Sequence, residues 1–162
     1  MSHSSLSVGL YYEDYIINGV YITTSRNIGH VDVEAFSRLT LDVNPLHVDP
    51  VEMKQHPYKK PVVHGMLVAS IAVGLISCLG LTRKTLVAML DQRIVYKKPV
   101  YVGDTVHVKM EVIDKRETGN PTRGIVVYRY EVLNEAGVVV VEGTNTNMVF
   151  RKNTLKQNGE KK

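Results

Sequence analysis

The most distinctive feature of the hydropathy pattern is a long stretch without charge in the first half of the chain. Between Val63 and Thr82 no side chain carries a full charge unless His64 is protonated. A segment that is apolar on nearly every side is typical of a helix buried in a core. The pattern therefore predicts a central helix over Gly65 to Leu79.

The second half of the chain has the pattern of extended strands. Four long runs rich in β-branched and aromatic residues follow Thr85, and short connections with glycine or proline separate most of them. The runs are Leu86 to Val100, Thr105 to Glu117, Arg123 to Asn134 and Val138 to Phe150. Connections this short permit only antiparallel neighbours. One antiparallel sheet with a single long apolar helix must wrap around that helix to cover it, which predicts an α+β architecture.

Two shorter helical segments are expected before the central helix. Asp32 is predicted to cap the first of them, with Ala35, Phe36 and Leu39 on its buried side at helical spacing. Asp49 is followed by proline and opens the second segment as its cap. We therefore interpret Asp49 as a cap and not as a catalytic acid.

A polar break before the central helix is the first candidate for chemistry. Asp42 and His47 would lie about 140° apart around a single helix. Asn44-Pro45 interrupts the helix, because proline lacks a backbone donor and restricts the residue before it. The two side chains can then converge across a tight loop as a general acid-base pair. A turn started by Asp42, with a partly buried and hydrogen-bonded His47, fits the same spacing, so spacing alone leaves both interpretations open.

The start of the central helix is the second candidate. The chain enters the helix through His64-Gly65, and free backbone N–H groups at a helix start can hold a developing oxyanion. Glycine also lets a ligand approach the main chain closely. His64 is expected to make a structural hydrogen bond, because the chemistry needs no second titrating group.

Together these two features resemble a known family. Residues 42–50 read Asp-Val-Asn-Pro-Leu-His-Val-Asp-Pro and residues 63–67 read Val-His-Gly-Met-Leu. Both segments look like the signature of the MaoC-like dehydratases, the (R)-specific enoyl-CoA hydratases of the hot dog fold. The likeness continues through the strand, proline and Gly-Asp turn of residues 96–104. The resemblance implies a curved antiparallel sheet wrapped around a long central helix, and a two-fold homodimer joined at exposed sheet edges.

The resemblance also implies an activity, the hydration of trans-2-enoyl-CoA to (R)-3-hydroxyacyl-CoA or the reverse dehydration. Asp42 and His47 would then activate water and protonate C2, while the Gly65 N–H stabilises the thioester enolate. Which member of the pair takes the water proton stays open. Asn44 would fix the loop and could touch the water or the acyl chain, although a purely structural amide beside Pro45 fits as well. The CoA or acyl-carrier thioester is a substrate, and no cofactor is implied.

The same residues bear on three rival functions. A (3R)-hydroxyacyl-ACP dehydratase of fatty-acid synthesis would use the same pair, so it stays open as the nearest alternative. A thioesterase of the same fold would carry its carboxylate on the central helix, which has no acid between Gly65 and Leu81. A non-enzymatic acyl-CoA binding module would not need Asp42 and His47 together.

Neither a metal site nor a nucleic-acid interface is expected. The six histidines show no pairing with cysteine or carboxylate at ligand spacing. The segment 151–162 contains five basic residues and one acidic residue, and without it the 20 basic and 16 acidic residues of the chain balance. A balanced domain lacks the basic face that nucleic acids require.

Length and composition fit a single domain. The chain has 162 residues, of which 44% are hydrophobic and 22% charged. We interpret residues 1–10 as a flexible leader, 11–150 as one hot dog domain and 151–162 as a basic polar tail. The uncharged run is shorter than the ~20 residues of a membrane span. The lone Cys78 cannot form an intrachain disulfide, so we expect a reducing compartment, the cytoplasm or, in a eukaryote, the mitochondrial matrix.

Overall fold

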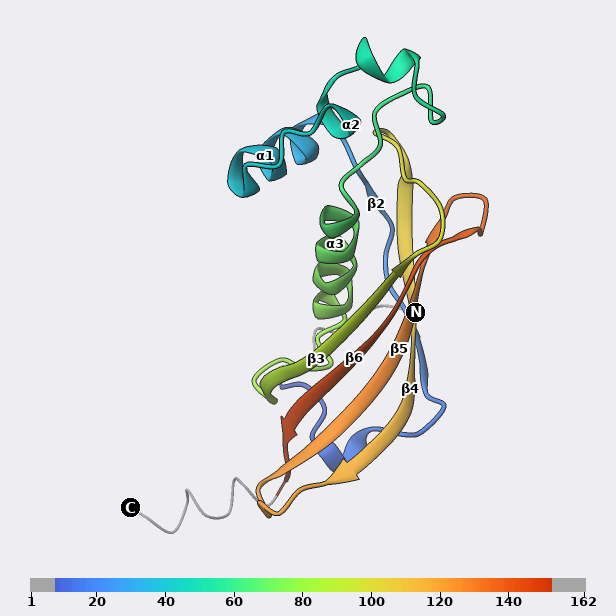
Figure 1. Ribbon diagram of the computed structural model, residues 1–162. Helices are drawn as coiled ribbons and strands as arrows, with labels where there is room; N and C mark the ends of the chain where they lie inside the picture. The colour runs from blue at the N-terminus through green and yellow to red at the C-terminus, as the bar shows by residue number, and fades with distance from the viewer. Residues whose placement is uncertain (1–7, 153–162) are drawn as a thin grey trace.

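One long helix and the sheet that curves around it make up most of the structure (Figure 1). The computed structural model describes residues 8–152. The central helix is α3 (Gly65–Cys78). The sheet is antiparallel with the order β1-β4-β5-β6-β3, and β2 also pairs with β4. The strands are β1 (Val20–Ile22), β2 (Arg26–Asn27), β3 (Leu86–Tyr96), β4 (Thr105–Glu117), β5 (Arg123–Asn134) and β6 (Val139–Phe150). The predicted architecture is confirmed.

The core lies between α3 and the concave side of the sheet. Every second residue of the first half of β4 is buried, as the period of two in a strand requires. The buried residues of the core include Val106, Val108, Met110 and Val112 from β4, and Leu67, Val68, Ala72, Leu75 and Ile76 from α3. Burying one such aliphatic side chain stabilises the fold by roughly 1.5–3 kcal/mol. Within residues 8–152 no helix is long and apolar enough to cross a membrane.

The connection from β3 to β4 departs from the prediction. Short connections implied neighbouring strands throughout, but β3 pairs with β6 at the far side of the sheet from β1. Residues 97–104 cross between them, which is possible because an extended segment of that length reaches up to about 26 Å, against about 14 Å for three strand spacings. β3 ends at Tyr96 and not at Val100, since Pro99 has no N–H for the ladder. The crossover then pairs with the segment before α3, where the Val63 N–H donates to the Val100 carbonyl at 2.8 Å.

Three short helices lie beyond the amino-terminal end of α3 (Figure 1). They are α1 (His30–Thr40), α2 (Pro45–Val48) and η2 (Glu52–Lys54). Asp32 lies inside α1, where its carboxylate accepts a hydrogen bond from the Gly29 N–H at 2.8 Å. The Asp49 carboxylate accepts from the N–H groups of Val51 and Glu52 at 2.8 and 3.0 Å. These donors lower the pKa of Asp49. The carboxylate thus holds the turn that leads into η2, whereas the N-cap of η2 itself is Val51 and not Asp49.

The buried side of α1 differs from the prediction. Val33 and Ser37 are buried and Phe36 is half-buried, whereas Ala35 and Leu39 are exposed. The helix lies beyond the amino-terminal end of α3 and not along the sheet (Figure 1), so it covers only a narrow stripe of side chains. A small polar residue, Ser37, therefore occupies a position that hydropathy alone would give to a large apolar one.

The ends of the folded part also differ from the prediction. Gly9 and Leu10, assigned to the leader, form backbone hydrogen bonds with the segment that follows α3. Arg151, assigned to the tail, contacts the acidic η1 (Tyr12–Asp14) through Glu13 at 3.0 Å. The rest of the predicted leader and tail, residues 1–7 and 153–162, lies outside the described residues.

The residue that ends α1 allows a test of how its left-handed backbone conformation affects stability. Leu41 caps the helix in the left-handed region, with φ 63° and ψ 13°, and is 82% exposed. Because a Cβ atom destabilises this conformation by about 1 kcal/mol or more, Leu41→Gly should raise the free energy of unfolding by up to about 1 kcal/mol in urea titrations. Leu39 is equally exposed at 82% but lies inside α1. Leu39→Gly should therefore lower the free energy of unfolding by about 1 kcal/mol, and a loss in both variants would contradict the argument.

Candidate active site

His47 is held by its ring at the third position of α2. The helix is capped by Asn44, whose Oδ1 accepts from the Leu46 N–H at 3.0 Å, and it begins at Pro45. His47 Nδ1 lies 2.8 Å from the Val62 carbonyl oxygen. A carbonyl only accepts, so Nδ1 carries the proton of the neutral ring and Nε2 keeps its lone pair. Nε2 is therefore the nitrogen available for acid-base chemistry.

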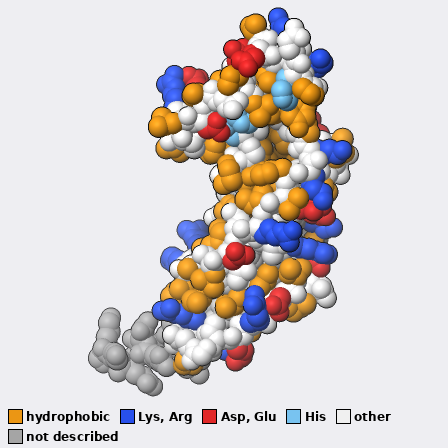
Figure 2. Space-filling model, in the orientation of Figure 1, with side chains coloured by type: hydrophobic (Ala, Val, Ile, Leu, Met, Phe, Trp, Pro, Cys, Tyr) orange, Lys and Arg blue, Asp and Glu red, His pale blue; other side chains and the backbone are white. Residues whose placement is uncertain are grey.

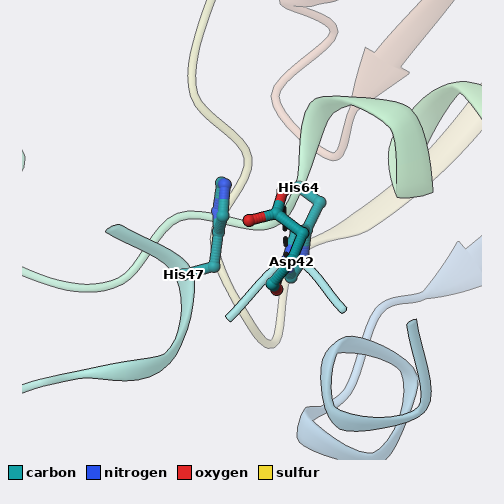
Figure 3. A group of neighbouring side chains, drawn as sticks. All are labelled: Asp42, His47 and His64. Atoms are coloured by element: carbon teal, nitrogen blue, oxygen red, sulfur yellow. Dashed lines mark hydrogen bonds and ion pairs between the residues drawn. The ribbon is translucent and has the colours of Figure 1, made fainter. Parts of the chain in front are cut away.

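Asp42 follows Leu41, the residue with left-handed backbone angles that ends α1. Its side chain is 50% exposed, and its Oδ1 accepts from the Asn44 N–H at 3.3 Å. One potential ligand atom from each of Asp42, His47 and His64 lies within 4.8 Å of the other two. Figure 3 shows the three side chains grouped in this way, with the Asp42 carboxylate turned towards the His47 ring. The structure thus brings the predicted pair together across the loop.

Gly65 opens α3 with an unused donor. Its N–H has no acceptor among residues 8–152, and it lies at the positive end of the helix dipole. A Cβ at Gly65 would lie 2.8 Å from Cε1 of Tyr96, whose ring packs directly on the glycine. The Tyr96 hydroxyl lies 3.2 Å from Met66 Sδ, and burial raises the pKa of its phenol. A larger residue at position 65 would therefore displace the Tyr96 ring.

His64 is buried beneath the pair, with 2% of its surface exposed. Its Nε2 lies 3.0 Å from the Asp42 carbonyl oxygen and 3.4 Å from Ser37 Oγ. Its ring stacks on His47 with centroids 3.9 Å apart and an interplanar angle of 26°. The sequence predicted a structural hydrogen bond for this residue but not the stacking, because no spacing rule connects two residues on separate segments.

These groups open into one cavity of about 620 Å³. Asp42, His47, His64 and Gly65 line it, but Asn44 does not. The remaining wall includes Phe36, Tyr58, Tyr96, Lys97 and Lys98. Lys97 and Lys98 directly follow β3, and both are exposed.

The group of Asp42, His47 and His64 also has the composition of a metal site, which the sequence did not predict. Metal ions bind in the plane of an imidazole ring, at about 2.0–2.1 Å for zinc. The planes of His47 and His64 are stacked at 26°, so their lone pairs do not converge on one point. The arrangement fits two neighbouring acid-base groups better than a metal centre.

Comparison with known proteins agrees with this geometry. Residues 16–135 match the family model described as MaoC like domain. The chain is 35% identical over 119 residues to an (R)-specific enoyl-CoA hydratase of Aeromonas caviae, covering 74% of this chain and 84% of the relative. It is 30% identical over 129 residues to a mitochondrial 3-hydroxyacyl-[acyl-carrier-protein] dehydratase of Arabidopsis thaliana, covering 79% and 74%.

A solved structure extends the likeness to three dimensions. The (R)-hydratase from A. caviae matches with a TM-score of 0.70 at 30% identity, over 83% of this chain and 97% of that one. The curved antiparallel sheet around α3 is the hot dog fold. Since the family model spans well over half of the residues, the chain belongs to the family of MaoC-like domains.

Proposed function

We propose that this protein hydrates trans-2-enoyl-CoA to (R)-3-hydroxyacyl-CoA, or catalyses the reverse dehydration. The observation that carries the proposal is the convergence of three unlike groups on one cavity. These are the Asp42 carboxylate, the free Nε2 of His47 and the unused N–H of Gly65. The relatives named as hydratase and dehydratase support the same reaction.

The three groups divide the chemistry of water addition between them. A water molecule held by Asp42 and His47 loses a proton to one of them as its oxygen bonds to C3 of the enoyl group. The thioester becomes an enolate, and the Gly65 N–H stabilises the charge on its oxygen at the start of α3. The pair then delivers a proton to C2 and returns to its starting charge. Asn44 supports this geometry by capping α2 and does not line the cavity.

We further propose free CoA as the acyl carrier. Lys97 and Lys98 line the cavity, and Lys97 also pairs with Glu142 at 3.2 Å. A few local cations suit the phosphates of CoA, whereas recruiting an acidic carrier protein calls for a broad basic field. The balanced charge of the domain offers no such field. The acyl-carrier dehydratase named among the relatives remains the second candidate.

The protein is also proposed to act as a homodimer. β3 is an edge strand and none of its residues is buried. Next to it, α3 exposes an outward stripe that includes Met66, Ser70 and Gly74, with Met66 at 54%. A second copy that paired along β3 would cover both the free edge and this stripe.

We propose the cytoplasm as the compartment. Cys78 is exposed and free. Such a thiol persists in a reducing environment and is prone to oxidation outside it.

The acid-base pair is tested with isosteric variants in crotonyl-CoA hydration. Asp42→Asn removes the charge, and His47→Asn keeps a donor for the Val62 carbonyl while removing Nε2. Each should lower kcat by about 10²–10⁴-fold, the usual contribution of a general acid or base, with little change in melting temperature. Asp49→Asn is the matched control, since Asp49 holds the turn before η2 outside the cavity, and it should keep wild-type turnover. Normal turnover with a lowered melting temperature in the first two variants would return both residues to a structural role.

The dimer is tested by placing a charge on the stripe. A Cβ at Gly74 meets no atom within 4 Å, so Gly74→Glu is tolerated by a single copy but buries a carboxylate if a second copy covers α3. Sedimentation velocity should show wild-type dimers and monomeric Gly74→Glu. Gly119 lies in the turn between β4 and β5 and is equally open within 4 Å. Gly119→Glu should remain dimeric, and a dimeric Gly74→Glu would rule out this interface.

Carrier choice is tested with matched crotonyl-CoA and crotonyl-carrier-protein substrates at two salt concentrations. The free CoA thioester should have the higher kcat/KM. Its salt dependence should be modest, because exposed charges are screened beyond ~8–10 Å at physiological ionic strength. A preference of about a hundredfold for the carrier protein that collapses in high salt would instead identify the acyl-carrier dehydratase.

A further inference from the structure

We propose that His64 is a positioning residue for the acid-base pair, acting through both Asp42 and His47 without touching the reacting atoms. The inference rests on the proposed hydration reaction. The mechanism above uses no proton of His64, yet this side chain is 2% exposed and lies against both members of the pair. A buried histidine that neither titrates in the reaction nor binds substrate requires another explanation.

The position of its proton follows from its partners. The Asp42 carbonyl oxygen can only accept, so His64 donates to it through an Nε2–H at 3.0 Å. Nδ1 of the neutral ring then carries a lone pair, and Nδ1 is buried without a hydrogen-bond partner among residues 8–152. An unpaired buried nitrogen destabilises the fold, and an apolar ring of the same shape would avoid that cost. The bond to Asp42 is therefore the contact that a histidine supplies and a packing residue would not.

That bond is the long-range anchor of Asp42. The other hydrogen bonds of Asp42 within the described residues are local, from its own N–H to Thr40 Oγ1 at 3.3 Å and from the Asn44 N–H at 3.3 Å. Local bonds fix the shape of the loop but not its place in the molecule. The His64 bond ties the loop to the start of α3, which is held in the core by burial.

The ring of His64 fixes the second member of the pair. His47 is held at its edge by the Val62 carbonyl, at 2.8 Å, and at its face by His64, at 3.9 Å between centroids. A tilted Phe36 ring, 5.1 Å away, packs against His64 in turn. One side chain therefore sets the spacing between Asp42 and His47, and a shift of about 1 Å in such a pair is enough to cost roughly a hundredfold in rate.

Three substitutions separate the donor from the ring. His64→Gln places an amide N–H close to the position of Nε2, His64→Asn places one close to Nδ1, and His64→Phe keeps a stacking ring without a donor. In crotonyl-CoA hydration we expect His64→Gln, which keeps the donor to Asp42 but loses the ring stacked on His47, to lower kcat by less than about tenfold. We expect His64→Asn and His64→Phe to lower kcat by about 10–100-fold with KM changed less than about threefold, because substrate binding is intact while the pair is misplaced.

The outcomes separate positioning from simple structural support. If His64→Phe has the kcat of wild type, the bond to Asp42 is irrelevant. If His64→Gln has a kcat as low as that of His64→Asn, a donor at the position of Nε2 is not what matters. Either result overturns the proposal, as would losses of kcat that merely follow the melting temperature across the three variants.

A measurement without substrate keeps the proposal distinct from the proposed function. Long-range ¹H–¹⁵N NMR of the wild-type protein should place the proton of His64 on Nε2 and that of His47 on Nδ1. A proton on Nδ1 of His64 refutes the anchoring bond whatever the enzyme does. A wild type with these proton positions but no hydration of any enoyl thioester would instead refute the proposed reaction, and with it the positioning role.

Discussion

The site depends on one short segment, Val62 to Gly65, whose last residue is the first residue of the central helix. Each functional group is held by, or belongs to, this segment. The Val62 carbonyl accepts from His47 Nδ1, the His64 ring donates to the Asp42 carbonyl, and Gly65 contributes its own unused N–H. A hydrogen bond fixes both the distance and the direction between its donor and its acceptor. The relative positions of the proposed acid, base and oxyanion donor are therefore set by four consecutive residues.

The segment can serve as a reference because both of its ends are held. Before α3, the Val62 N–H donates to the Leu46 carbonyl at 3.0 Å and the Val63 N–H donates to the Val100 carbonyl at 2.8 Å. After it, α3 is fixed by apolar burial along most of its length. The uncharged composition of α3 therefore has a functional consequence. A more polar helix would pack less firmly against the sheet, and the position of Gly65 at its start would then be less well fixed.

The sequence predicts those parts of the molecule whose secondary structure depends on the local residue composition alone. Absence of charge located α3 to within a residue of its end at Cys78, and runs of β-branched and aromatic residues located the four long strands. Prediction failed where the structure depends on how segments distant in the sequence pack against each other. Leu39 is apolar but exposed, because α1 covers only a narrow stripe, and β3 pairs with β6 because the crossover is long enough to reach. Stacking of His47 on His64 has no local signature at all.

The geometry is compatible with similarity to both a relative named as an enoyl-CoA hydratase and one named as an acyl-carrier-protein dehydratase. The proposed reacting groups lie on the Val62 to Gly65 segment and the loop tied to it, whereas Lys97 and Lys98 belong to the crossover, which pairs with that segment through Val100. Charge changes on the crossover leave the hydrogen bonds to Val62 and His64 intact. Carrier recognition can thus vary while the acid-base geometry stays fixed, since exposed charges mainly alter encounter and binding.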